Sequence, residues 1–308
     1  MHFRRLLPVL LAIAAVSAAA GAQRFHGTGM AVAVDIPKQS VTISHQAIGG
    51  YMDAMVMAFH VNDAAELKGL APGAKVEFTL VVDKGSTWIE QLHTVDYWSA
   101  ERDPEQAHRL SLIESILNKS AEHELKQGDA VPDFTLTDET NHPVRLSQFR
   151  GKVIAMNFVY TRCPLPDYCF RLSNNLAQLQ KRFTADLGRD LILLTITFDP
   201  VRDTPEVMAK YAHIWNANLK VWHFLTGPLP EVRRVCGLFG VAAWQDEGIL
   251  THSLHTVIID RQGQLAANIE GNTYTVRQLG DLVDEIIYPA EKHGAPKRLT
   301  SSIPRESQ

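Results

Sequence analysis

The chain has 308 residues, of which 45% are hydrophobic and 21% charged, and its formal net charge is -4. This length allows about two domains, and the composition is that of a globular protein. The negative balance argues against nucleic-acid binding, which requires a basic face, and against attraction to an anionic membrane surface. The three cysteines are too few for a disulfide scaffold.

The first 22 residues predict an export signal. Arg4 and Arg5 form a positive start, residues 6–20 are uncharged and rich in Leu and Ala, and Ala20-Gly21-Ala22 fits the small-x-small cleavage pattern. An uncleaved membrane anchor is the alternative, although the apolar stretch is short for a span, which needs about 20 residues. In either case we expect the folded part in the periplasm or at the outer face of the inner membrane, which is an oxidising environment.

Residues 24–98 predict a small all-β unit, most simply a five-stranded OB-like barrel. Turn residues such as Ala71-Pro72-Gly73 separate its strand-like runs. These runs are residues 30–34, 39–44, 76–82 and 87–95. Residues 99–127 are polar with some apolar positions at helical spacing, and they predict a helical linker.

Between residues 128 and 288, strand-like and helix-like segments alternate, which predicts an α/β layered domain. The runs at 152–160 and 191–198 are almost continuously apolar, as buried parallel strands are. A hairpin is expected around Asn141-His142-Pro143 and another at 255–270. Helices are expected at residues 169–183, 204–215, 229–239 and 275–287. Residues 289–308 are polar and predict a disordered tail.

Cys163 and Cys169 follow the first buried strand directly and lie at the start of the next helix. A helix N-terminus stabilises negative charge, so we expect a lowered thiol pKa and a favoured thiolate, the form that is both nucleophile and metal ligand. Two soft sulfur atoms close together suit Cu(I). A plain stabilising disulfide is the alternative, but the strand end of an α/β sheet is where ligands usually bind.

Several motifs in this half resemble known proteins. The openings at 128–136 and 146–153 resemble thioredoxin-fold proteins. More specifically, the chain resembles the Sco/SenC copper chaperones over residues 128–288, through Tyr160-Thr161-Arg162-Cys163-Pro164, the stretch at 198–206 and Thr251-His252-Ser253. The resemblance implies a thioredoxin-like fold, copper bound by two cysteines and a distant histidine, and a role in assembling the copper-A centre of cytochrome c oxidase.

Carried over by position, the resemblance assigns Cys163, Cys169 and His252 as ligands of Cu(I) and also of Cu(II). It implies a client metalloprotein such as cytochrome c oxidase subunit II. The chain departs from the family pattern twice: its cysteines are spaced C-x5-C instead of C-x3-C, and Thr251 replaces the aspartate before the histidine. The longer cysteine loop bears on copper affinity, Cu(II) binding, redox potential and the choice of client.

Other residues of this domain have weaker assignments. Asp199 and Asp203 are candidates for orienting a ligand or holding Arg202, with helix capping by Asp203 as the alternative. Cys236 is interpreted as a buried core thiol. The histidines without a motif are interpreted as surface or locally hydrogen-bonded residues, and they are His213, His223 and His255.

A second candidate site lies in the N-terminal unit, where His45, Met52, Met55 and Met57 fall within a short span. Met55 and Met57 share one side of a strand, and thioethers are soft, neutral ligands that prefer Cu(I). The alternative is that the methionines fill the barrel interior.

The segment also resembles CusF-type copper-binding domains through Gly27-Thr28-Gly29 and the stretches at 41–45 and 55–59. That resemblance implies a five-stranded barrel that binds Cu(I) through one histidine and two methionines under a tryptophan. In this chain Met52 takes the position of the tryptophan.

Together these features favour an extracytoplasmic copper chaperone over an enzyme. The barrel would acquire Cu(I), and the thiolate pair with His252 would take the metal and deliver it. A thiol–disulfide oxidoreductase that uses Cys163 and Cys169 as redox residues is the alternative, and a peroxiredoxin-like peroxidase is a more distant one. Copper sequestration without a client is a third hypothesis.

Overall fold

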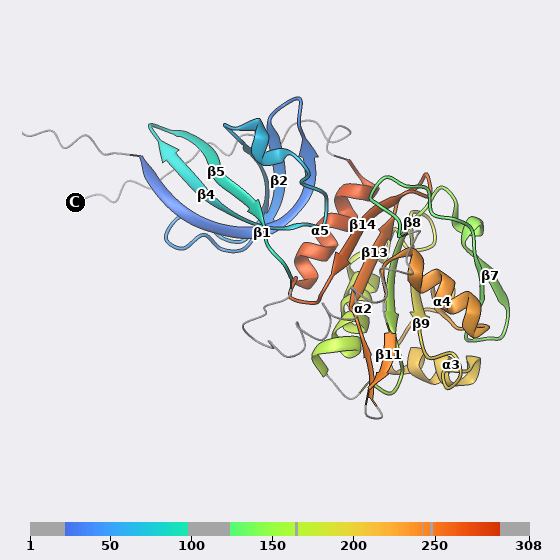
Figure 1. Ribbon diagram of the computed structural model, residues 1–308. Helices are drawn as coiled ribbons and strands as arrows, with labels where there is room; N and C mark the ends of the chain where they lie inside the picture. The colour runs from blue at the N-terminus through green and yellow to red at the C-terminus, as the bar shows by residue number, and fades with distance from the viewer. Residues whose placement is uncertain (1–21, 98–123, 164–165, 242, 247–248, 290–308) are drawn as a thin grey trace, which may run out of the picture.

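The computed structural model describes residues 22–97, 124–163, 166–241, 243–246 and 249–289. The signal expected at 1–22, the linker expected at 99–127 and the tail expected at 289–308 therefore fall largely outside the described residues. Within the described residues, no helix has both the length and the apolar character needed to cross a bilayer. Figure 1 shows an N-terminal unit of strands beside a larger layered α/β unit.

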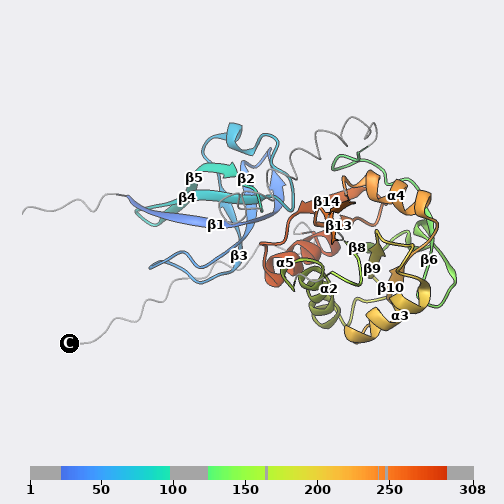
Figure 2. The same cartoon turned by 60° about the horizontal axis from the view of Figure 1, so that its bottom comes forward.

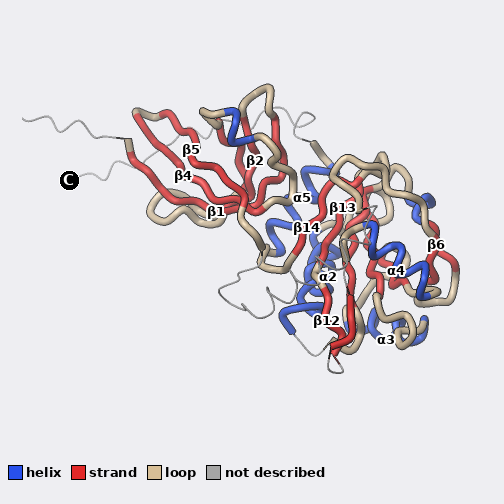
Figure 3. The backbone as a smooth tube through the Cα atoms, viewed as in Figure 1, coloured by secondary structure: helices blue, strands red, loops and turns tan. Residues whose placement is uncertain are grey.

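The N-terminal unit is an antiparallel sheet of five strands, as predicted, in the order β3-β2-β1-β4-β5. A bridge between Val61 and Ile89 joins the two edges of the sheet. Figure 3 shows that the unit is built almost entirely of strands and loops, and its one short helix is the 3₁₀ turn η1 (Ala64–Leu67). Its strands are β1 (Gln23–Asp35), β2 (Ser40–His45), β3 (Val56–His60), β4 (Lys75–Asp83) and β5 (Ser86–Thr94).

The C-terminal unit is built on a second five-stranded sheet, in the order β10-β9-β8-β13-β14. Strands β8 (Val153–Val159), β9 (Leu191–Thr197) and β10 (Trp222–Leu225) are parallel. Strands β13 (His255–Ile259) and β14 (Leu265–Glu270) extend the sheet in antiparallel fashion. Every residue of β8 and β9 is buried because both faces of the sheet are covered, which confirms the α/β prediction.

Helices cover this sheet on both faces. The helices α2 (Arg171–Arg182) and α5 (Val276–Ile287) pack against each other and against β8. On the other face lies α4 (Leu229–Leu238), where the ring of Phe239 meets that of Phe158 at 5.8 Å (Figures 1 and 2). The remaining helix, α3 (Pro205–Ile214), packs beside the edge strand β10.

Small elements complete the domain. The expected hairpin at Asn141-His142-Pro143 consists of β6 (Thr135–Thr137) and β7 (Pro143–Arg145), followed by the 3₁₀ turn η2 (Leu146–Phe149). The sequence analysis indicated β3 only through the strand assumed for Met55 and Met57, and it did not predict β10 or the hairpin of β11 (Ala243–Asp246) and β12 (Ile249–His252). Each of these strands has five residues or fewer, which is too short for a clear alternation of apolar and polar residues.

The two units share a packed contact. Along β1, the side chain of Ala31 lies in the barrel core, whereas Met30 and Val32 belong to the buried cluster of the C-terminal unit. All three residues are at most 2% exposed, because the barrel covers one face of β1 and α5 covers the other. The run of buried residues in β1 is therefore a consequence of domain packing.

Polar groups fasten the end of β2 to α5. The guanidinium of Arg277 donates to the carbonyl of His45 at 2.5 Å and to Ser44 Oγ at 3.1 Å. Ser44 Oγ donates to a carboxylate oxygen of Asp281 at 2.7 Å, and Gln278 Nε2 donates to the Ser44 carbonyl at 3.2 Å. We call this set the β2–α5 clamp.

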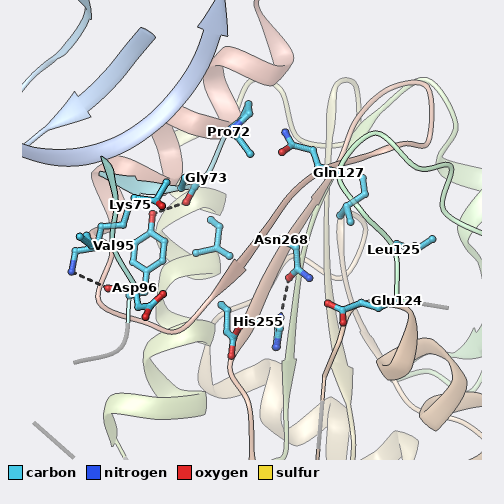
Figure 4. Close-up of a pocket in the computed structure, with 17 residues that line it drawn as sticks. Pro72, Gly73, Lys75, Val95, Asp96, Glu124, Leu125, Gln127, His255 and Asn268 are labelled. Carbon is cyan, nitrogen blue, oxygen red and sulfur yellow. Dashed lines mark hydrogen bonds between the residues drawn. The ribbon is translucent and has the colours of Figure 1, made fainter. Parts of the chain in front are cut away.

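A cavity of about 600 Å³ lies between the two units (Figure 4). Gly73 and Lys75 line it from the barrel, and Gln127, His255 and Asn268 line it from the C-terminal unit. Asn268 Oδ1 is 2.9 Å from His255 Nδ1 and its amide donates to the Phe239 carbonyl at 2.9 Å. The cavity is therefore a partly polar gap in an interface that is otherwise closely packed.

The clamp predicts a local stability effect. In Arg277→Ala the carbonyl of His45 loses its charged donor, a loss that costs about 2 kcal/mol. We expect hydrogen exchange of the β2 amides to accelerate accordingly. Arg234→Ala is the matched control, because Arg234 is an exposed arginine of α4 paired with Glu231, and such surface pairs contribute below about 1 kcal/mol. Equal exchange in the two variants would contradict the clamp.

Candidate metal centres

The loop after β8 positions the first cysteine. β8 ends at Val159, and the Cys163 amide then donates to the Tyr160 carbonyl at 3.3 Å, which closes a tight turn. The ring of Tyr160 is buried against Phe198 at 5.4 Å, at the end of the neighbouring strand β9. The turn therefore presents Cys163 at the carboxyl ends of two parallel strands, which is the usual ligand-binding edge of such a sheet.

The two thiols lie together. Cys163 and Cys169 are hydrogen-bond partners, Cys163 is half-buried and Cys169 is 1% exposed. Burial, and next the hydrogen bond to Cys163, raise the pKa of the Cys169 thiol well above its ordinary value. The expectation of a lowered pKa is therefore wrong for Cys169 in the metal-free protein, because loss of hydration outweighs the helix N-terminus.

The wide C-x5-C spacing has a structural counterpart. An irregular π-type turn, Pro166–Phe170, precedes α2, and within it Tyr168 has non-helical backbone angles (φ -108°, ψ -114°). Such turns accommodate extra residues at a helix start and occur often at functional sites. The turn brings Cys169 back to Cys163 although five residues separate them, and α2 begins only at Arg171, later than predicted.

Two aspartates organise the cysteine loop. Asp203 accepts hydrogen bonds from the amide and hydroxyl of Thr161, at 3.1 and 2.6 Å, and from the Thr197 hydroxyl at 2.6 Å. It makes no cap for α3, whose N-cap is Thr204, so the capping alternative is wrong. Asp199 pairs with Arg162 at 3.0 Å and with Arg202 at 3.5 Å.

Backbone pairing determines the end of the sheet at which the backbone of His252 lies. β13 is antiparallel to β8, with Thr256 opposite Asn157, so the chain that enters β13 comes from the end of the sheet where β8 leads into the cysteine loop. His252 is the last residue of β12 and precedes β13 by a short connection. Its side chain is outside the description. The topology therefore brings the backbone of the predicted third ligand to the edge that carries the two thiols.

In the barrel, the β2–β3 pairing gathers the second set of predicted ligands. Ile43 pairs with Met57 and Ser44 with Val56, and the His45 amide donates to the Met55 carbonyl at 3.0 Å. Side chains that alternate along two paired strands then place His45, Met55 and Met57 on one face. Met52 lies in the connecting loop, where its backbone pairs with that of Ile48.

The imidazole of His45 fits a metal ligand. The ring is fully buried, its Nδ1 lies 2.7 Å from the Gln46 carbonyl, and its Nε2 is a buried atom without a hydrogen-bond partner. Burial lowers the pKa of His45, although the bond to Gln46 opposes the shift, so the ring is neutral at pH 7. A carbonyl on Nδ1 fixes the tautomer that leaves the Nε2 lone pair available, as in many metal-binding histidines.

The methionines differ in exposure. Met52 and Met57 are partly buried against the barrel core, whereas Met55 is 40% exposed. The ring of Tyr51 stacks on the ring of Phe25 in β1, with 4.8 Å between the ring centroids. The arrangement has a buried imidazole and an accessible thioether, which suits a metal that enters and leaves.

Gly29 has a steric role at this site that the sequence analysis did not predict. Gly29 pairs with His45, and a Cβ atom at Gly29 would lie 2.5 Å from Ile43 Cγ2 and 2.9 Å from the Cα of His45. Only glycine therefore allows β1 to approach β2 at the histidine. In the sequence, the Gly27-Thr28-Gly29 motif marks this position, which lies inside β1.

Comparisons with known proteins agree with the two-part architecture. A family model described as SCO1/SenC matches residues 122–287, and one described as copper binding periplasmic protein CusF matches residues 24–94. A putative copper-binding protein of Stutzerimonas stutzeri is 28% identical over 145 residues, which are 46% of this chain and 69% of that protein. Protein sco1 of Schizosaccharomyces pombe is 27% identical over 42% of this chain and 51% of its own length. The matches to this and several other curated relatives thus span only about half of each relative's length.

Among solved structures, yeast Sco1 with copper bound is 24% identical, with a TM-score of 0.44, and the match covers 55% of this chain and 96% of that one.

The buried thiol predicts a pH dependence. Because Cys169 is protonated at neutral pH, copper must displace its proton, so the Cu(I) affinity of the cysteine site should rise at least about tenfold per pH unit between about pH 6 and 8. Competition with a Cu(I) chelator measures this. In Cys163→Ser/Cys169→Ser, the remaining site has only thioethers and an already neutral His45, so its affinity should be flat above about pH 6.5. An equal pH dependence of Cu(I) affinity in the parent protein and in this variant would contradict the assignment of Cys169 as a copper ligand that must lose its proton.

The aspartate that holds the cysteine loop predicts a second effect. Asp203→Asn removes the carboxylate that accepts from Thr161, so Cu(I) affinity of the cysteine site should fall at least about tenfold, as for other residues that orient ligands. Glu206→Gln is the control, because Glu206 is exposed and accepts a hydrogen bond of 2.8 Å from the Thr204 hydroxyl, away from the cysteine loop. Unchanged affinity in Asp203→Asn would exclude a positioning role.

Proposed function

The chain belongs to the SCO1/SenC family, whose model matches more than half of it, and from this premise we propose that it is an extracytoplasmic copper chaperone with two copper sites. Cys163, Cys169 and His252 would bind copper in the C-terminal unit. His45, Met52, Met55 and Met57 would bind Cu(I) in the barrel. The observation that carries the proposal is the pair of adjacent thiols, Cys163 and Cys169, at the ligand-binding edge of the sheet.

The donor chemistry supports copper as the cargo. Thiolates and thioethers are soft ligands that select Cu(I), and both candidate sites combine sulfur with an imidazole. The match of residues 24–94 to the CusF model adds a second, independent copper-binding unit. In the cysteine site, the sulfur atoms of Cys163 and Cys169 and one nitrogen of His252 would leave the coordination of copper incomplete, which favours transfer of the metal over permanent binding.

We infer a direction of transfer from the strength of the ligands. The neutral barrel site, with its exposed Met55, would take up Cu(I). The cysteine pair, which binds Cu(I) more strongly once its thiols are deprotonated, would then receive the metal by stepwise ligand exchange. The cysteine site would then serve a client metalloprotein such as cytochrome c oxidase subunit II. The match to a periplasmic family supports a location outside the cytoplasm.

A thiol–disulfide oxidoreductase is the second candidate, because the thiols of Cys163 and Cys169 lie next to each other. The raised pKa of Cys169 argues against that residue as the attacking nucleophile, since the thiolate is the reactive form. The half-buried Cys163 would have to take this role. Sequestration would need the same copper sites but no client.

Copper stoichiometry tests the proposal. The reduced full-length protein should bind two equivalents of Cu(I), whereas Cys163→Ser/Cys169→Ser and Met55→Leu/Met57→Leu should each bind one. His252→Ala should weaken the cysteine site at least about tenfold and leave the barrel site unchanged. Full affinity in His252→Ala together with catalytic disulfide reduction would instead establish the oxidoreductase.

Transfer and client are tested with intact chains. Copper loaded on Cys163→Ser/Cys169→Ser should move to apo Met55→Leu/Met57→Leu when the two are mixed, and absence of movement would refute transfer. Loss of oxidase activity in a deletion strain would indicate delivery. Copper sensitivity with normal oxidase activity would indicate sequestration.

A further inference from the structure

We propose a third metal site, formed by Asp138, Glu139 and His223, that binds a divalent first-row transition cation. It lies where the β6–β7 hairpin meets the edge strand β10, on the side of the domain away from the barrel (Figures 1 and 2). One ligand atom from each of the three residues lies within 4.8 Å of the other two. The family resemblance assigns no role to these residues.

Backbone contacts hold the hairpin in place. Thr137 and Thr226 exchange hydrogen bonds of 2.7 and 2.8 Å, which pins the end of β6 to the end of β10. Glu139 Oε2 accepts from the Phe224 amide at 2.8 Å. The two acidic residues that follow β6 are thereby directed at His223 on the edge strand.

Both carboxylates are buried. Asp138 is 8% exposed and Glu139 is 5% exposed, and within the described parts of the chain neither forms an ion pair with lysine or arginine. Asp138 Oδ1 accepts three hydrogen bonds of 2.8 Å, from the amide and hydroxyl of Thr140 and the amide of His142. Within the described residues, these bonds leave Oδ2 of Asp138 for another partner. Two buried carboxylates side by side are unfavourable unless protonation or a cation reduces their charge.

His223 supplies the third donor. Its Nδ1 is a buried atom with no hydrogen-bond partner, and its ring stacks on Phe149 at 5.6 Å, which fixes the ring plane. Burial lowers the pKa of His223, so the imidazole is neutral at pH 7 and has a lone pair. Burial also raises the pKa of Glu139, and the nearby Asp138 charge adds to this effect. Burial acts in the same direction on Asp138, but its hydrogen bonds to His142 and Thr140 outweigh it, so the pKa of Asp138 is lowered.

The donor set differs from that of the copper sites. Two carboxylate oxygens and one imidazole nitrogen contain no sulfur, so they disfavour Cu(I) and suit a divalent ion such as Zn²⁺. A dication would neutralise both carboxylates and occupy the Nδ1 lone pair. It would also join the hairpin to β10 through side chains.

Zinc binding to a full-length variant without the copper ligands tests this inference. In Cys163→Ser/Cys169→Ser/Met55→Leu/Met57→Leu, calorimetry should show one saturable equivalent of Zn²⁺, and the melting temperature should rise on binding. Co²⁺ in the same variant should give ligand-field absorption without thiolate charge transfer.

Single substitutions assign the site. Glu139→Gln keeps an oxygen for the Phe224 amide but removes the charge, so it should weaken Zn²⁺ binding at least about tenfold, as should His223→Gln. Glu231→Gln, which alters a partly exposed acid on α4, should bind as the parent does. Absence of a saturable equivalent, or equal affinity in Glu139→Gln and Glu231→Gln, would overturn the proposal. That result would indicate that a proton shared by Glu139 and His223 compensates the charge instead.

Discussion

The pairing of β13 with β8 is the constraint on which the cysteine centre depends. Because the strands are antiparallel and Thr256 lies opposite Asn157, the segment that leads into β13 must start beside the loop that leaves β8. Residues far apart in the sequence, Cys163 and His252, are thereby brought to one edge. The ladder of hydrogen bonds between β13 and β8 sets this relation between the two backbone segments, and it does so without a contribution from a metal.

The predicted donor atoms of the barrel and of the cysteine pair differ in whether they carry a proton. His45 is neutral and its Nε2 is already free of hydrogen bonds, whereas Cys169 is protonated and shares a hydrogen bond with Cys163. Under the proposed function, copper would enter the first set without releasing a proton and would enter the second only by displacing one. The relative affinity of the two proposed sites would then depend on proton concentration, and an increase in pH would favour the thiolates.

Much of the fold could be predicted from the sequence because its signals are local. The continuous apolar runs became β8 and β9, and the Thr204-Pro205 start became the beginning of α3. The raised pKa of Cys169 could not be predicted, since it depends on burial by elements distant in the chain. The proximity of His223 and Glu139 could not be predicted for the same reason: the two residues are neighbours only because the end of β6 contacts β10. The predicted copper ligands, by contrast, rest on short motifs that need no tertiary information.

The packing of β1 has a consequence for protein dissection. Met30 and Val32 are core residues of the C-terminal unit although they belong to a barrel strand, and Arg277 holds the carbonyl of the residue that carries the barrel imidazole. A fragment that ends at residue 97 would expose two apolar side chains and lose the charged donor to His45. Such a fragment would tend to self-associate, and a dissociation constant measured on it would describe a loosened histidine, not the one in the intact molecule.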